Sequence, residues 1–182
     1  MTRNKFFSSW LVGFLSLAAL SAPSWSLSSD RNQAINIQAN KAVSNDKTGV
    51  TTYEGAVQID QGSLRIWADR VTIERLDNKV KRIVAKGSPA RFQQKPAEDK
   101  SLVVAEGFVI HYLVAKDRIT LTQNASLEQE GTTMTGESID YDIAHAVVKA
   151  NAGDAGEQGR VQIVIPPQSD QEQEQEQNVT DP

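Results

Sequence analysis

Apolar and polar residues alternate with a period of two through most of the chain between residues 27 and 167. Successive side chains of a β-strand point to opposite faces, so each alternating run places its apolar residues on one face. The runs are rich in β-branched and aromatic residues, turn-forming residues separate them, and no window has a helical period. The pattern predicts an all-β protein of about 14–16 short antiparallel strands without a helical domain. The clearest runs are residues 34–38, 56–60, 64–67, 71–74, 108–112, 119–122 and 161–165.

A short motif recurs along this region. It consists of a small residue, a polar or acidic residue, any residue and then an alternating apolar pair, and its four copies are about 29, 37 and 31 residues apart. A second motif, clearest in Tyr53-Glu54-Gly55-Ala56-Val57, lies between the copies. Units of this size cannot bury their apolar faces alone, so we expect them to stack into two facing sheets around one apolar interior. The copies of the first motif begin at Ala39, Ala68, Ala105 and Gly136, and those of the second at Tyr53, Gly87 and Leu121.

The two ends of the chain differ from this region. Residues 1–26 have the features of a cleaved secretory signal: Arg3 and Lys5, an apolar run over residues 10–20, and Ser24-Trp25-Ser26 as a cleavage site. The alternative is an uncleaved anchor, but the apolar run is shorter than the roughly 20 residues that span a bilayer. Residues 168–182 contain Gln-Glu-Gln-Glu-Gln-Glu-Gln and almost no apolar residue, which is typical of a disordered tail. We therefore predict one folded domain, residues 27–167, in an exported, soluble protein.

Composition excludes several functions. The chain has no cysteine, which rules out disulfides, thiolate nucleophiles and cysteine zinc sites, and only two histidines, His111 and His145. The net charge of −4 comes mainly from the tail, and residues 27–167 carry −1, so the basic stripe of a nucleic-acid-binding protein is missing. Asp140, Asp142 and His145 lie close in sequence, but their spacing matches no standard metal site. We expect neither an enzyme nor a metal or cofactor.

The first and last strands are candidates for pairing with another chain. Ile35, Asn36 and Ile37 open the first strand, and the last strand carries no charge and ends at Pro166-Pro167. An uncharged apolar edge favours aggregation unless it pairs with a partner, although an interior strand of a closed barrel is the alternative. The residues of the last strand are Val161, Gln162, Ile163, Val164 and Ile165.

The alternation also predicts which residues face inward. Parity alone does not distinguish a ligand groove from the dry interior of a sandwich. Three arginines, Arg65, Arg70 and Arg75, lie on or near these strands, either as ordinary surface charges or as phosphate contacts at a rim. The inward set is Ile35, Ile37, Tyr53, Val57, Ile59, Ile66, Phe92, Ile110, Tyr112, Leu121 and Leu127.

An ordered series of short motifs gives the chain a family resemblance. The series runs from Ile35-Asn36-Ile37 through Ile66-Trp67-Ala68-Asp69, Gly87-Ser88-Pro89 and Ala105-Glu106-Gly107 to Gly136-Glu137-Ser138-Ile139. With the signal and the absence of cysteine, it resembles the LptA family of periplasmic lipopolysaccharide-export proteins, over about residues 35–166. The Gln/Glu tail is not part of that pattern.

The resemblance implies a half-open, twisted β-jellyroll that is not an enzyme and carries lipopolysaccharide between the two membranes of the cell envelope. It also implies end-to-end assembly of identical copies, with an LptC-like component at the inner membrane and an LptD-like component at the outer membrane as partners. The acyl-chain-facing positions of the family coincide with Ile35, Ile37, Phe92 and Tyr112 in this sequence.

Elementary energetics agrees with such a carrier. Exposing one acyl chain of about a dozen carbons to water costs on the order of 10 kcal/mol, so lipid A needs a continuous apolar surface along its route. The inward set then lines a groove for acyl chains. The alternative is a structural adaptor that links membrane complexes through strand pairing and has a closed, dry core.

Overall fold

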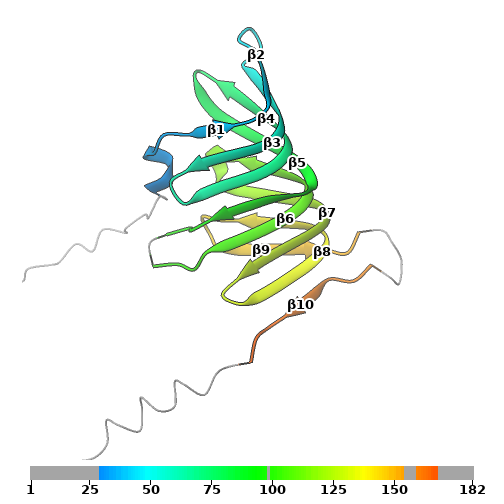
Figure 1. Ribbon diagram of the computed structural model, residues 1–182. Helices are drawn as coiled ribbons and strands as arrows, with labels where there is room; N and C mark the ends of the chain where they lie inside the picture. The colour runs from blue at the N-terminus through cyan, green and yellow to red at the C-terminus, as the bar shows by residue number, and fades with distance from the viewer. Residues whose placement is uncertain (1–28, 98, 154–158, 168–182) are drawn as a thin grey trace, which may run out of the picture.

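The computed structural model describes residues 29–97, 99–153 and 159–167. The predicted signal (1–26) and the predicted disordered tail (168–182) lie outside these residues. Within them the chain forms ten strands and two short 3-10 helices, which confirms the all-β prediction (Figure 1). The elements are η1 (Ser29–Asn32), β1 (Asn36–Gln38), β2 (Lys41–Asn45), β3 (Val50–Gln61), β4 (Leu64–Leu76), β5 (Lys79–Gln94), β6 (Val103–Leu113), η2 (Val114–Lys116), β7 (Arg118–Gln129), β8 (Thr132–Asp142), β9 (Val147–Asn151) and β10 (Gln162–Val164).

All ten described strands belong to one antiparallel sheet, and they are stacked in nearly sequential order in Figure 1. The order is β1-β3-β4-β5-β6-β7-β8-β10, with β2 also paired to β3 and β9 also paired to β8. Each of the two outer long strands, β3 and β8, therefore carries two short strands on its outer edge. β1 pairs with the second half of β3, and β2 pairs with its first half. At the other end, β10 pairs with the first half of β8, and β9 pairs with its second half.

The six long strands all bend near their middle. The strand register shifts at the same level in every neighbouring pair from β3·β4 to β7·β8, where unpaired residues interrupt the ladder. In β3 the unpaired residues Gly55 and Ala56 have φ angles of +79° and +45°, and in β7 Gln123 and Asn124 have +65° and +57°. Such bulges bend a strand and increase its twist. Because they are adjacent in space, they form a single bend line across the sheet.

Because of the bend line, the structure differs from the sequence prediction in the number of strands and in the number of sheets. The expected 14–16 short strands are ten described strands, because an alternating run on either side of a bulge belongs to one long strand. The two expected facing sheets are two halves of a single sheet folded along the bend line. The repeated motifs mark this line: Asp69, Gly107 and Glu137 of the first motif and Gly55 and Gly87 of the second lie at the register shifts or, for Glu137, opposite one.

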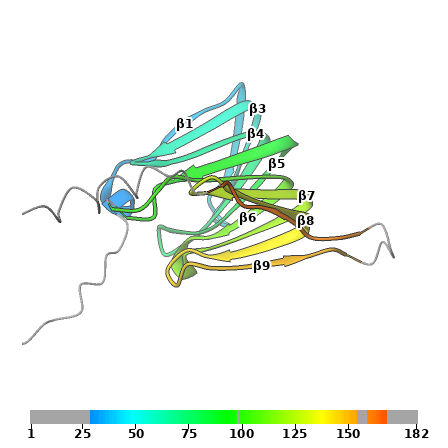
Figure 2. The same cartoon turned by 90° about the horizontal axis from the view of Figure 1, so that it is seen from below.

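Folding along the bend line produces two layers with one apolar interior (Figure 2). The first layer contains β1, β10 and the halves of the long strands that pair with them, and the second contains β2, β9 and the other halves. The side opposite the bend line, formed by the turns that connect the long strands, is called the mouth here. The result is the half-open β-jellyroll that the family resemblance implies: the layers are covalently continuous at the bends, and side-chain contacts connect them at the mouth.

Backbone conformation at the bend gives a stability prediction. Replacing Gly55, whose φ is +79°, with Ala places a side chain in the left-handed region, and its Cβ would lie 2.6 Å from the Asn40 Nδ2 atom. We expect Gly55→Ala to lower the free energy of unfolding by about 1 kcal/mol in urea titrations. Ala56→Gly is the matched control, because glycine tolerates the φ of +45° at that position, and it should lose no stability. Equal losses in both variants would contradict a strain at Gly55.

Candidate functional site

The interior between the layers contains most of the predicted inward residues. Eight of the eleven are at most 4% exposed, and they belong to one continuous hydrophobic cluster with residues from both layers. Across its centre the Phe92 ring of the first layer contacts the Tyr112 ring of the second edge-on, with ring centroids 5.7 Å apart. The layers are thus packed against each other at this level, so a ligand reaches these residues only when the layers separate. The eight buried residues are Val57, Ile59, Ile66, Phe92, Ile110, Tyr112, Leu121 and Leu127.

The apolar inner face continues to both ends of the stack, where it becomes accessible. At the β1 end, Ile37 and Tyr53 are half-buried and pack against the core, and Ile35 is 37% exposed. At the β10 end, Ile163 is 51% exposed and pairs in register with Met134, which packs against the core. Ile163 therefore lies on the inner face of the sheet. The interior is closed at its centre and open at its two ends.

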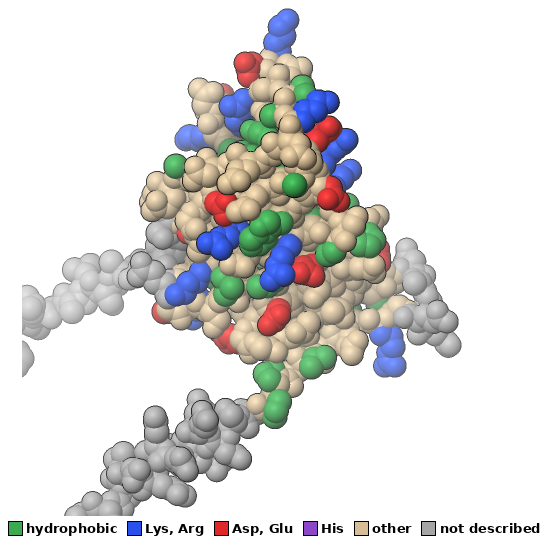
Figure 3. All heavy atoms as spheres, in the orientation of Figure 1, with side chains coloured by type: hydrophobic (Ala, Val, Ile, Leu, Met, Phe, Trp, Pro, Cys, Tyr) green, Lys and Arg blue, Asp and Glu red, His purple; other side chains and the backbone are tan. Residues whose placement is uncertain are grey.

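The residues predicted to pair with another chain lie at opposite ends of the sheet. β1 contains Asn36 and Ile37, β10 contains Gln162, Ile163 and Val164, and the outer edges of both strands pair with nothing in the described ranges. Exposed apolar side chains gather at the lower end of Figure 3, around β10. The same end also includes Ile165, which is 74% exposed, and the half-buried Val161.

Two tyrosine hydroxyls lie in this otherwise apolar interior. Burial, followed by the neighbouring negative charge of Asp117, raises the pKa of Tyr112, whose hydroxyl donates to Asp117 over 3.4 Å. Burial, followed by the charge of Asp142, also raises the pKa of Tyr141. The Tyr141 hydroxyl is buried and has no hydrogen-bond partner among the described residues. It is thus a polar atom held in an apolar interior without compensation.

The short helix η1 also belongs to this site, although no pattern in the sequence predicts its role. Asp30 accepts hydrogen bonds from the first layer, and Arg31 donates to the backbone oxygen of Val114 in the second layer over 2.7 Å. Arg31 also forms an ion pair with Asp117. The helix therefore connects the two layers at the mouth.

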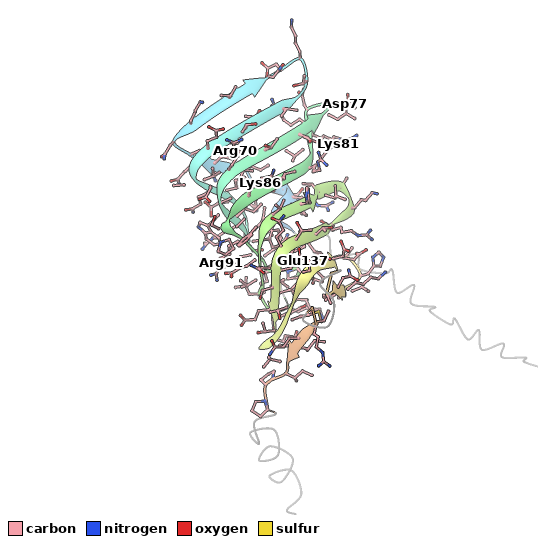
Figure 4. The ribbon with its side chains drawn as sticks, turned by 90° about the vertical axis from the view of Figure 1, so that its right-hand side faces the viewer. Arg70, Asp77, Lys81, Lys86, Arg91 and Glu137 are labelled. Atoms are coloured by element: carbon pink, nitrogen blue, oxygen red, sulfur yellow. The ribbon has the colours of Figure 1, made fainter. Side chains whose placement is uncertain are left out.

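The outer faces carry several ion pairs. Each predicted rim arginine has a carboxylate partner: Arg65 with Asp60 at 3.5 Å, Arg70 with Glu54 at 2.9 Å, and Arg75 with Asp46 at 3.6 Å. In Figure 4, which shows the side of the bend line, Arg70 and Lys86 lie on neighbouring strands. Both line a shallow hollow of about 460 Å³. The pairing favours the interpretation of the three arginines as ordinary surface charges.

The histidines also have ordinary surroundings. His111 lies half-buried on the outer face, where burial first, and then the positive charges of Arg82 and Lys86, lowers its pKa. Asp142 accepts hydrogen bonds from Arg118 and His145, both over 2.8 Å, and these hold its pKa at about 2. In the part of the chain that the structure describes, no group of three or more His, Cys, Asp or Glu side chains has the arrangement of a metal site.

A bent, open antiparallel sheet with an apolar interior, whose end strands have a free outer edge among the described residues, defines the class of protein: an open β-jellyroll. The sequence model of the LptA/(LptD N-terminal domain) LPS transport proteins matches residues 36–147. The chain therefore belongs to the LptA family. No helix within the described ranges is long and apolar enough to cross a membrane.

Individual relatives cover about three quarters or more of the chain. The lipopolysaccharide export system protein LptH of Pseudomonas aeruginosa is 36% identical over 162 residues, 86% of this chain and 93% of its own. The corresponding protein LptA of Escherichia coli K12 is 32% identical over 142 residues, 77% of this chain and 76% of its own. The crystal structure of P. aeruginosa LptH, described as the periplasmic LptA homologue of the lipopolysaccharide transport device, superimposes with a TM-score of 0.70. This superposition covers 76% of this chain and 99% of that chain, at 38% identity.

The uncompensated hydroxyl of Tyr141 gives a second stability prediction. Tyr141→Phe removes a buried polar atom without breaking a hydrogen bond, so the free energy of unfolding should rise by about 1 kcal/mol. Tyr112→Phe is the matched control, because it loses the contact with Asp117 and should be neutral or destabilising. Urea titrations of both variants measure the difference. A loss of stability in Tyr141→Phe would mean that its hydroxyl has a stabilising partner.

Proposed function

We propose that the protein carries lipopolysaccharide across the periplasm, shielding lipid A acyl chains between its two layers. Membership of a family named for LPS transport supports the general role. The observation that supports the specific mechanism is the continuous cluster of apolar side chains on the inner face, which extends from Ile37 at one end of the sheet to Met134, the partner of Ile163, at the other. An acyl chain on such a face avoids the cost, on the order of 10 kcal/mol, of exposure to water. The role is non-enzymatic and requires no cofactor.

We further propose that copies assemble end to end into a bridge between the membranes. The geometry of the edges supports this assembly, because β1 and β10 belong to the same layer and β2 and β9 to the other. A second copy placed at one end can thus extend both layers, and main-chain hydrogen bonds would provide the affinity. The matching family model includes the N-terminal domain of LptD, which supports an LptD-like component as the proposed partner at the outer membrane. An LptC-like component is the proposed partner at the inner membrane.

A second function competes with this one. The edge contact between Phe92 and Tyr112 and the near-zero exposure of the interior favour a structural adaptor with a dry core. Such an adaptor would link membrane complexes by the same strand pairing without binding lipid. The two functions differ in whether the purified protein binds lipopolysaccharide in the absence of its partners.

Site-specific crosslinking tests the carrier function. A photo-crosslinking amino acid at Phe92 or Ile37, on the inner face, should trap lipopolysaccharide in cells. The matched positions Gln93 and Asn36 lie next to them on the outer face and should trap little or none. Gel mobility and an antibody to lipid A identify the adduct. Labelling from the outer positions alone would contradict the carrier function. If the purified protein binds no lipopolysaccharide and no position is labelled, the adaptor function is favoured.

The edge strand β10 provides a test of assembly. Ile163→Asp puts a charge on the exposed inner face that a second copy would cover, and should weaken self-association at least roughly tenfold. Phe108→Asp is the control, because Phe108 is 41% exposed and lies at the register shift of β6, in the middle of the strand order and away from both edges. Light scattering over a concentration series measures the dissociation constants. Equal self-association of both variants and the unmodified protein would overturn the assignment of this edge.

A further inference from the structure

The mouth of the jellyroll is crossed by η1, whose two central residues contact different layers. The layers are continuous with each other only at the bend line, so a contact at the mouth opposes their separation at the side where they can move furthest apart. Asp30 is more deeply buried than Arg31 and accepts more hydrogen bonds than Arg31 donates.

Asp30 anchors η1 to the first layer. Asp30 is 6% exposed. Its carboxylate accepts hydrogen bonds from the Ser63 backbone N–H at 2.7 Å, from the Ser63 hydroxyl at 2.6 Å and from Gln94 Nε2 at 3.2 Å. The fit is tight: a Cβ on Gly62 would lie 2.2 Å from the Asp30 carboxylate. A buried carboxylate with several donors is costly to release, because each donor would lose a charge-assisted hydrogen bond.

Arg31 makes the contact with the second layer, and this contact is weaker. The Arg31 and Asp117 side chains are 29% and 19% exposed, so water screens their ion pair in part. Arg31 Nη2 donates to the Val114 oxygen, while the buried Nε of the same guanidinium has no partner among the described residues. An unpaired buried donor reduces the net gain from closing this contact. When the layers separate, the Arg31 contacts should therefore break before the Asp30 contacts.

The Arg31 contact is also coupled to the aromatic pair in the centre. Asp117 accepts from Arg31 and from the hydroxyl of Tyr112, and the ring of Tyr112 packs against Phe92 across the interior. A lipid chain that enters between Phe92 and Tyr112 must displace Tyr112 relative to the first layer. Such a displacement moves Asp117, and with it the partner of Arg31.

We propose that η1 is a clasp: it remains anchored to the first layer through Asp30 and releases Val114 and Asp117 from Arg31 when a lipid enters the interior. The clasp rests on the proposed carrier function and adds the regulation of its site. It holds the empty protein closed, which prevents exposure of the apolar interior to water, and it opens at a modest free-energy cost. Residues 63, 94, 114 and 117 thus belong to the carrier's mechanism although none of them lines the centre of the interior.

Kinetics of lipid binding test the clasp. Arg31→Gln removes the ion pair, and labelled lipopolysaccharide should then associate with the protein about fivefold faster in stopped-flow fluorescence. The control is Arg118→Gln, which removes a comparable surface pair with Asp142 on the outer face and should leave the association rate unchanged. A purely structural tie would lower the melting temperature of Arg31→Gln without changing the association rate, and that result would overturn the proposal.

Reversible locking provides the converse test, because the natural chain contains no cysteine. Arg31→Cys and Asp117→Cys are introduced together and joined by a short bifunctional methanethiosulfonate reagent. Lipid association should slow at least roughly tenfold and recover when dithiothreitol cleaves the link. Unchanged association in the locked protein would overturn the clasp.

Hydrogen exchange, together with a measurement of lipopolysaccharide binding, distinguishes a failure of the clasp from a failure of the carrier function. On addition of lipopolysaccharide, amides 114–117 should exchange faster while amides near Ser63 and Gln94 keep their protection. If the unmodified protein binds no lipopolysaccharide, the carrier function fails, and the clasp fails with it. If it binds, and lipid association in Arg31→Gln, lipid association in the locked protein or the exchange pattern is unchanged, the clasp alone fails.

Discussion

The structure depends on one geometric constraint: unpaired residues interrupt six neighbouring strands at the same level. A flat sheet with this alternation would expose one apolar face to water, and the only way to bury it within one chain is to fold the sheet onto itself. The bulges make this possible with only a local interruption of the ladder, because strand pairing continues on both sides of Gly55-Ala56 in β3 and of Gln123-Asn124 in β7. Both segments use left-handed backbone conformations. The interior, the mouth and the edges all follow from this line of bends.

The faces of the strands could be predicted from the sequence, and the path of the chain only in part. Parity correctly separates buried Ile59, Ile66 and Phe92 from their outward neighbours, because a period of two is a local property of a strand. The strand number was wrong because a bulge interrupts the alternation in the same way as a turn. Gln123-Asn124, for example, has the composition of a turn, yet β7 continues through it. The repeated motif does mark the bends, but its spacing contains no information on whether the chain turns back or continues.

The clasp could not be predicted from the alternation of apolar and polar residues or from the repeated motifs. Arg31 and Val114 are 83 residues apart in sequence, and Asp30 and Gln94 are 64 apart. Neither pair belongs to a strand alternation, and a polar segment such as Ser29–Asn32 has the composition of any linker. Its importance arises only from the layers that the bends bring together. The exposure of Ile163 could not be predicted either, because it reflects the place of β10 as the last strand of the sheet, with no further described strand beyond it.

The presence of two short strands at each end of the sheet has a mechanical consequence for the proposed assembly. A joint between copies that used one ladder would leave them free to rotate about that ladder. A joint that uses β1 with β10 and β2 with β9 has two separated lines of hydrogen bonds, one in each layer, and so it resists twisting. Neighbouring interiors would stay aligned as the filament bends, and a long molecule could slide from one copy to the next without meeting a step.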